Sequence, residues 1–279
     1  MDRNQFLKRL QSKLTSFESA ISTNEKEWII KGFIDVYKNI YTISLDTKII
    51  SKVLELLLFP LMQNFAKESD LELELSPEQN FYPDLTFIDK KDNTLFAVDI
   101  KTTYRINDEK VNGMTLGAFT GYFRNRESTK NIAYPYNKYA GHFVLGVIYS
   151  QSKKNIDERK IYSIQELYKM PSVIHNFQFF AQPKYKIASA RPGSGNTKNI
   201  GSITEIQKLL NGEGAFSKLG ESVFDDYWQF YLTADMAAKL ETVRPYSNLK
   251  EYLAYKSKNS EILQEHKNEI EKTSESFED

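Results

Sequence analysis

The stretch FYPDLTFIDKKDNTLFAVDIKTTYR, residues 81–105, decides the fold because it holds two apolar runs separated by a short polar turn. The runs at 84–89 and 94–104 are rich in the β-branched and aromatic residues that favour strands. The turn KKDN, residues 90–93, has the length and composition of a hairpin loop. The stretch therefore predicts a β-hairpin interrupted by charged residues.

The register of this hairpin follows from its loop. If Asp89 pairs with Thr94 across a four-residue loop, Asp84 lies opposite Asp99. Because strand side chains alternate between two faces, Lys101 shares a face with Asp99. The alternation sends three apolar side chains to the other face: Phe96, Val98 and Ile100.

Two opposed carboxylates need a partner of positive charge. Cβ atoms of directly opposed residues lie ~5 Å apart, and like charges at that distance destabilise the strand pair. Carboxylate oxygens suit Mg²⁺, and Lys101 is placed to orient or deprotonate an attacking water and to offset charge on phosphorus. A surface salt bridge between one carboxylate and Lys101, without a metal, explains the same pattern.

The composition is that of an ordinary globular protein. The chain has 279 residues, 41% hydrophobic and 13% aromatic, which suffices for one large domain with a packed core. It has no cysteine and three histidines, so we expect any metal to be held mainly by oxygen. Since no apolar run approaches ~20 residues and no signal peptide is evident, we expect a cytoplasmic protein without a membrane segment.

Charge is distributed unevenly although it sums to zero. Residues 259–279 carry seven acids and two lysines, which leaves 35 basic and 30 acidic side chains in the rest of the chain. We expect this tail to be a frayed helix or disordered. Two basic segments, RNRESTK (124–130) and KYKIASARPGSGNTK (184–198), are candidate phosphate-facing patches or simply solvated loops.

Periodicity predicts a mixed α/β fold. We expect a mixed central sheet flanked by helices in one domain, residues 1–258, with a smaller subdomain that includes 28–43. Asp46 is placed to cap a helix over 46–67, and Pro60 to kink or split it. The other expected elements are an amphipathic helix at 5–17, strands within 28–43 and at 139–150, and helices at 203–211 and 222–240.

The charged hairpin resembles the PD-(D/E)xK nuclease superfamily, through Pro83-Asp84 and Asp99-Ile100-Lys101. A more specific resemblance, to EcoRV-type type II restriction endonucleases, runs in order over roughly 200 residues. Its motifs are DTK (46–48), the Glu of VLELL, QNFYPD (79–84), DIKTTY (99–104), TKNIAYP (129–135), GSGNTKNIGSI (193–203) and DYW (226–228).

The resemblance implies the roles of the catalytic residues. Asp84 and Asp99 would hold Mg²⁺, and Lys101 would assist the water that attacks the scissile phosphodiester. Glu55 matches an acid near the family's metal site and would be an auxiliary ligand. On its own pattern, Glu55 belongs to the polar stripe of an amphipathic helix, and a solvated side chain is the alternative.

The glycine-rich segment RPGSGNTKN (191–199) lacks the lysine and hydroxyl ending of a Walker loop, so we expect no nucleotide cofactor. A plain surface turn is one interpretation. In EcoRV-like enzymes the matching loop reads bases in the major groove, and glycine, Asn and Thr suit that task. The residues implied are Gly193, Ser194, Gly195, Asn196, Thr197 and Asn199.

Further DNA contacts are implied outside this loop, by Gln79, Asn80, Thr47, Thr102, Thr103 and Lys130. The intact GSGNT implies recognition of GATATC or a close relative with a blunt central cut. The family further implies a homodimer on double-stranded DNA, with residues 28–43 in the dimerisation region.

Three departures from the family qualify these expectations. Phe81 replaces a histidine, the region after DYW is less basic, and residues 151–183 match poorly. The aromatic run within 176–183 fits either base stacking or core packing. Two other functions stay open: a PD-(D/E)xK nuclease selective for branched or nicked DNA, and a DNA-binding protein that does not cleave.

Overall fold

The computed structural model describes residues 1–78, 80–152, 156–193, 198–256 and 261–264. Its helices are α1 (Arg3–Gln11), α2 (Leu14–Ile21), α3 (Thr47–Glu68), α4 (Lys184–Ile187), α5 (Ile206–Asn211), α6 (Glu221–Phe230), α7 (Ala234–Lys239), α8 (Leu249–Lys256) and α9 (Glu261–Gln264). Its strands are β1 (Gly32–Ile34), β2 (Ile40–Thr42), β3 (Leu71–Leu75), β4 (Leu85–Asp89), β5 (Leu95–Tyr104), β6 (Thr115–Ala118), β7 (Tyr139–Gln151), β8 (Ile161–Tyr162), β9 (Ile174–Pro183), β10 (Ala188–Pro192) and β11 (Asn199–Ser202).

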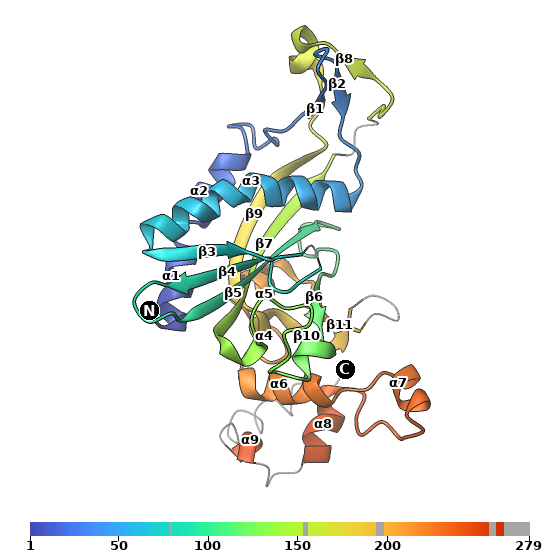
Figure 1. Cartoon of the computed structure of the whole chain (residues 1–279). Coiled ribbons are helices and arrows are strands. Elements are labelled where there is room, and N and C mark those ends of the chain that lie inside the picture. The colour runs from blue at the N-terminus through green and yellow to red at the C-terminus, as the bar shows by residue number, and fades with distance from the viewer. Residues whose placement is uncertain (79, 153–155, 194–197, 257–260, 265–279) are drawn as a thin grey trace.

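A five-stranded sheet in the order β3-β4-β5-β7-β9 forms the centre of the molecule (Figure 1). The pairs β3/β4, β4/β5 and β7/β9 are antiparallel, whereas β5 and β7 are parallel. Helices α1 to α3 cover one face, and the opposite face packs against α5, α6 and the small sheet β10-β11-β6. The predicted mixed α/β fold is confirmed.

The hairpin has the predicted register. Leu85 pairs with Val98 and Phe87 with Phe96, and the Asp89 N–H donates to the Thr94 carbonyl at 2.9 Å. Asn93 closes the loop with a φ of 58°, a left-handed conformation that asparagine tolerates better than most residues.

Strand β5 is buried on both faces, as expected where a parallel partner lies beside it. Phe96, Val98 and Ile100 join the core beneath α3, and Ala97 joins the core on the opposite face. Asp99 and Lys101 therefore emerge from a fully packed strand, which fixes their backbone.

Helix α3 is continuous over 22 residues even though Pro60 lies within it. Asp46 caps it as predicted, accepting from the Lys48 N–H at 2.7 Å. The helix is long and apolar: with 22 residues and a mean hydropathy of 1.4, it has the length and composition of a helix that could cross a membrane. Its side chains Ile50, Leu54 and Leu58 are nevertheless packed in the protein core beneath the sheet.

The strands predicted within residues 28–43 are β1 and β2. Together with β8 they form a separate three-stranded sheet that extends away from the body (Figure 1). We call residues 32–42 and 161–170 the arm. Its small core contains Ile40, Tyr162 and Met170.

Several predicted elements differ in the structure. The helix expected at 5–17 is two helices, because the chain turns at Ser12 and Lys13 before α2 packs along β9. The helix expected at 222–240 is likewise two, α6 and α7. The aromatic run in 176–183 is core packing: Phe177, Phe179 and Phe180 are buried in β9.

Candidate active site

Asp84 directly precedes β4 and lies across the hairpin from Asp99. Its Oδ2 accepts a hydrogen bond from the Ile100 N–H at 2.7 Å, so the carboxylate points at the backbone of the opposite strand. Burial and the neighbouring charge of Asp99 raise the pKa of Asp84 to about 7, although Lys101 opposes this. The two carboxylates therefore repel each other when both are ionised.

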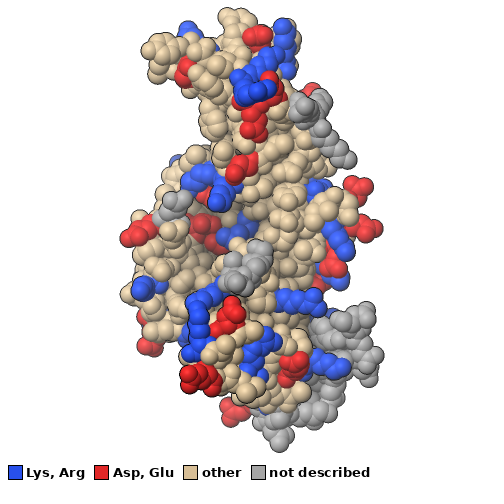
Figure 2. Space-filling view, turned by 90° about the vertical axis from the view of Figure 1, so that its right-hand side faces the viewer, with Lys and Arg blue, Asp and Glu red and all other residues tan. Residues whose placement is uncertain are grey.

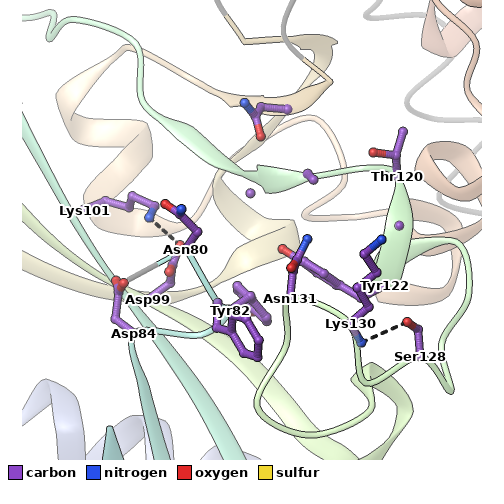
Figure 3. A pocket seen from close by; sticks show the side chains of 15 residues that line it. Asn80, Tyr82, Asp84, Asp99, Lys101, Thr120, Tyr122, Ser128, Lys130 and Asn131 are labelled. Carbon is purple, nitrogen blue, oxygen red and sulfur yellow. Dashed lines mark hydrogen bonds and ion pairs between the residues drawn. The ribbon is translucent and has the colours of Figure 1, made fainter. Parts of the chain in front are cut away.

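Lys101 provides the positive charge nearest to this pair. Its Nζ lies 2.6 Å from Asp99 Oδ2 (Figure 3). Burial lowers the pKa of Lys101, but the charges of Asp99 and Asp84 outweigh it and raise that pKa to about 12. Lys101 is thus an ammonium at neutral pH, suited to donating hydrogen bonds and offsetting negative charge rather than to removing a proton.

A cleft of about 580 Å³ opens in front of these three side chains. Three distant segments meet in it, which contribute Asn80, Lys130 and Asn199 of the predicted DNA-binding residues. In Figure 3, Asp84, Asp99 and Lys101 lie on one side, and Thr120, Tyr122 and Lys130 lie across from them. The structure therefore brings predicted catalytic and DNA-binding residues to one cavity.

Glu55 lies on the solvent-exposed side of α3 and pairs with Lys52 at 2.7 Å. It lines a second, adjoining cleft of about 670 Å³, which Asp84 also lines. Within the described part of the chain, no three Asp, Glu or His side chains converge on one point. Glu55 is thus beside the two aspartates, without joining them as a third ligand in this arrangement.

The three predicted threonines differ in their surroundings. Thr47 is exposed at the start of α3. Thr102 lies on β5, 2.5 Å from the Ser51 hydroxyl, and links β5 to α3. Thr103 is buried and donates its hydroxyl to the Asn112 carbonyl at 2.6 Å, so its side chain holds a loop inside the protein.

The predicted recognition loop is described only at its two ends. Gly193 is half-buried, and its N–H donates to the Asn199 carbonyl at 2.8 Å, which closes the base of the loop. Asn199 begins β11 and lines the cleft that Asp84, Asp99 and Lys101 also line. Five predicted residues lie outside the described residues: Gln79, Ser194, Gly195, Asn196 and Thr197.

The basic side chains of the two segments differ in exposure: Lys130, Arg191 and Lys198 are exposed, whereas others have partners within the protein. Arg124 donates to the Tyr231 carbonyl, Arg126 pairs with Asp225 at 3.0 Å, and Lys184 is buried. Lys130 is exposed at the cleft, with its backbone N–H bonded to Ser128. On the face in Figure 2, lysine and arginine side chains are scattered among acidic ones rather than gathered in one block.

Sequence reasoning missed part of the cleft wall. The residues concerned are Tyr82, Gly117, Thr120, Gly121, Tyr122 and Asn131. Tyr82 and Asn131 lie within the quoted motifs QNFYPD (79–84) and TKNIAYP (129–135), so membership of these motifs was a usable signal. The segment from Gly117 to Tyr122 carried no such signal, because β6 reaches the cleft only through pairing with β11.

The donor set fits a hard divalent cation. Two adjacent carboxylates offer oxygen ligands and leave room in the cleft for water and phosphate oxygens, as Mg²⁺ requires. A mixed sheet carrying Asp84, Asp99 and Lys101 on one hairpin defines a nuclease of the PD-(D/E)xK class.

Comparison with known proteins agrees with this class and narrows it. The family profile described as restriction endonuclease EcoRV matches residues 24–257. The type II restriction enzyme EcoRV of Escherichia coli is 34% identical over 236 residues, covering 84% of this chain and 93% of that enzyme. The chain belongs to the EcoRV restriction endonuclease family, and it is a site-specific deoxyribonuclease that acts on DNA.

Proposed function

We propose that this enzyme cleaves both strands of GATATC or a closely related palindrome, leaving blunt ends with 5′-phosphates, and requires Mg²⁺. The observation that carries the proposal is the opposition of Asp84 and Asp99 on one hairpin, beside Lys101 and in one cleft with Asn80 and Asn199.

Asp84 and Asp99 would hold Mg²⁺, with Glu55 as an auxiliary acid from the adjoining cleft. When bound, Mg²⁺ supplies Lewis acidity toward the phosphodiester and relieves the repulsion between the two carboxylates. The Lys101 ammonium would orient the attacking water and donate to a phosphate oxygen as negative charge increases there.

Specificity would come from the segment between β10 and β11 and from the turn before Asp84. Gly193 and Asn199 frame the first, with Ser194, Gly195, Asn196 and Thr197 between them as base-reading residues. Gln79, Asn80, Thr47, Thr102 and Lys130 would contact DNA around the cleft. Thr103 would act indirectly, because its hydroxyl is engaged with Asn112.

A homodimer would match the two-fold symmetry of a palindrome, with the arm as its interface. The arm exposes large apolar side chains: Val36 is 88% and Tyr37 83% exposed. We propose that residues 28–43 belong to a dimerisation subdomain of the 1–258 domain and that the enzyme works in the cytoplasm without a nucleotide cofactor. Of the 259–279 tail, only Glu261–Gln264 is described, as helix α9, and the rest lies outside the described residues.

The direct test is digestion of a plasmid of known sequence with one GATATC site and a second plasmid in which that site is changed by one base pair. We expect one blunt double-strand cut in the first plasmid, dependent on added Mg²⁺, and none in the second. Asp99→Asn should lower the cleavage rate by ~10³-fold or more while DNA binding in Ca²⁺ is retained.

Discrete fragments at an unrelated site would contradict the assigned recognition sequence but not the enzyme class. Cleavage of branched or nicked DNA regardless of sequence would favour a structure-selective nuclease. Specific binding without cleavage under any metal condition would favour a DNA-binding protein that has lost its activity.

A further inference from the structure

Lys184 is a buried lysine directly behind the catalytic cleft. It begins the short helix α4, between core strand β9 and strand β10, and only 2% of its surface is exposed. Its Nζ has no hydrogen-bond partner in the described part of the chain. An ammonium in such a place is costly to bury, which calls for a compensating role.

Three aromatic rings surround this ammonium; we call Tyr82, Phe123 and Tyr136 the aromatic cage. The Lys184 Nζ lies 4.8, 5.5 and 5.7 Å from their ring centroids, within the range of cation–π attraction. Tyr82 also lines the catalytic cleft. Tyr82 is therefore in contact with the ammonium on one side and with the cleft on the other.

Gly117 is also close to both the Lys184 ammonium and the cleft. A Cβ atom on this residue would stand 3.4 Å from the Lys184 Nζ, and Gly117 itself lines the cleft. The Tyr122 hydroxyl lies equally near, at 3.3 Å from that Cβ position, so Gly117 and Tyr122 bring the cleft close to the ammonium.

The charge of Lys184 persists at neutral pH. Burial lowers the pKa of Lys184 to about 8, and the attraction of Asp99 opposes that fall. His142, which bonds Tyr82 at 3.0 Å, stays neutral because burial and the charges of Lys184 and Arg126 lower its pKa. Lys184 is thus a buried cation behind the cleft, in addition to Lys101 and Lys130, which line it.

We propose that Lys184 is a positioning residue for DNA cleavage: its ammonium, held in the aromatic cage, is a fixed positive charge that draws the phosphodiester into the cleft and limits cation binding at Asp84 and Asp99. This inference rests on the proposed function, because it assumes that the two aspartates hold the metal. It adds a charge that touches neither metal nor DNA.

The test compares Lys184→Met with Lys184→Arg in the full-length protein. Titration calorimetry with Mn²⁺, without DNA, should give ~3- to 10-fold tighter binding for Lys184→Met, since a repelling charge is removed, and an unchanged affinity for Lys184→Arg. Single-turnover cleavage at saturating Mg²⁺ should slow several-fold in Lys184→Met only. Lys186→Met is the matched control: it removes the same charge from α4, and we expect wild-type values.

A purely structural role predicts equal or weaker Mn²⁺ binding in Lys184→Met, and that result would overturn the inference. Equal losses in the Met and Arg variants would do the same. Asp99→Asn separates the two proposals: Mn²⁺ binding that survives it contradicts the metal site and with it the role of Lys184, whereas an unaltered Lys184→Met contradicts the role of Lys184 alone.

If Lys184→Met is too unstable for calorimetry, melting temperatures of the single variants and of the double variant Lys184→Met/Asp99→Asn decide the matter. An attraction between the two charges predicts that the losses in melting temperature are less than additive. Additive losses would show that the ammonium and Asp99 do not interact and would overturn the inference.

Discussion

At the scale of single residues, the site holds two carboxylates that repel each other, Asp84 and Asp99, beside the favourably placed ammonium of Lys101. Asp84 is half-buried and opposes Asp99, and its carboxylate accepts a backbone hydrogen bond from the Ile100 N–H. Charged groups of this kind are common at active sites, because side chains arranged to bind a metal or a substrate repel one another when neither is bound. We expect the repulsion between Asp84 and Asp99 to lower the free energy of unfolding of the metal-free protein.

Because this repulsion depends on the ionisation of Asp84, its effect on stability should depend on pH. The pKa of Asp84 is raised to about 7 in the folded protein, so the fold binds this proton more tightly than the unfolded chain does. The contribution of Asp84 to stability is highest below pH ~4 and is lost as the pH rises through 7. We expect Asp84→Asn to be more stable than wild type by ~1–3 kcal/mol at pH 8 in EDTA, with a smaller difference at pH 5, measured by urea unfolding.

Asp92→Asn is the control for this experiment. Its carboxylate accepts hydrogen bonds from Thr94, which lower the pKa of Asp92, so its replacement should destabilise the protein at neutral pH rather than stabilise it. A stability difference between Asp84→Asn and wild type that does not change with pH would contradict the raised pKa.

At the scale of elements, the parallel pairing of β5 with β7 positions Lys101. Lys101 stands in register with Gly146, which in turn pairs with Phe180 of β9. The Phe180 ring occupies the space above Gly146: a Cβ on Gly146 would come within 2.0 Å of it. This glycine lets an aromatic ring pack against the strand beside Lys101.

We therefore expect Gly146→Ala to be destabilising. Because the contact is with a ring that is 2% exposed, the ring has no free space to move into, and the cost should be ~2–4 kcal/mol in urea unfolding. Gly113→Ala is the matched control, since its nearest contact would be at 3.9 Å, and it should change stability by less than ~0.5 kcal/mol. Equal effects of the two substitutions would argue against tight packing at β7.

At the scale of the whole molecule, the arm exposes apolar side chains that packing within the chain leaves uncovered. It contributes little to the two large cores and exposes Phe33, Ile34, Val36, Tyr37 and Tyr168. In a monomer this apolar surface would stay in contact with water, which is unfavourable, whereas a second copy of the chain would bury it.

Ile34→Asp should weaken dimerisation by about tenfold or more, because a carboxylate would be buried without a partner in the interface. Sedimentation equilibrium at micromolar concentration measures the effect directly. Val243→Asp places the same charge on another exposed apolar residue outside the arm and should leave the dimer intact. An undiminished dimer in Ile34→Asp would place the interface elsewhere.

Some features were predictable from the sequence because they depend on neighbours along the chain. The turn at residues 90–93 sets the register of β4 and β5, and Asp46 caps α3 through N–H groups two and three residues away. The prediction of one helix over 5–17 was wrong because the apolar periodicity continues through the break at Ser12 and Lys13. That break accompanies packing against β9, a distant segment that the local pattern does not contain.

Which basic side chains of the two segments are buried was not predictable from the sequence, because charge alone does not indicate burial. Arg126 is neutralised by Asp225, 99 residues away, and Lys184 is enclosed by rings from three separate segments. These partners come together only when the small sheet and α6 pack on the central sheet.

The sequence alone predicted the hairpin and the face shared by Asp99 and Lys101, and it predicted the register on the condition of a four-residue loop, because loop length and strand alternation then set the pairing. Only the tertiary structure decided that Asn80, Lys130 and Asn199 meet at that hairpin, that Asp84 is buried enough to hold its proton near neutral pH, and that Lys184 stands behind the cleft. The reason is physical: contacts between distant segments and the loss of solvent at a charge both arise from packing of the whole chain.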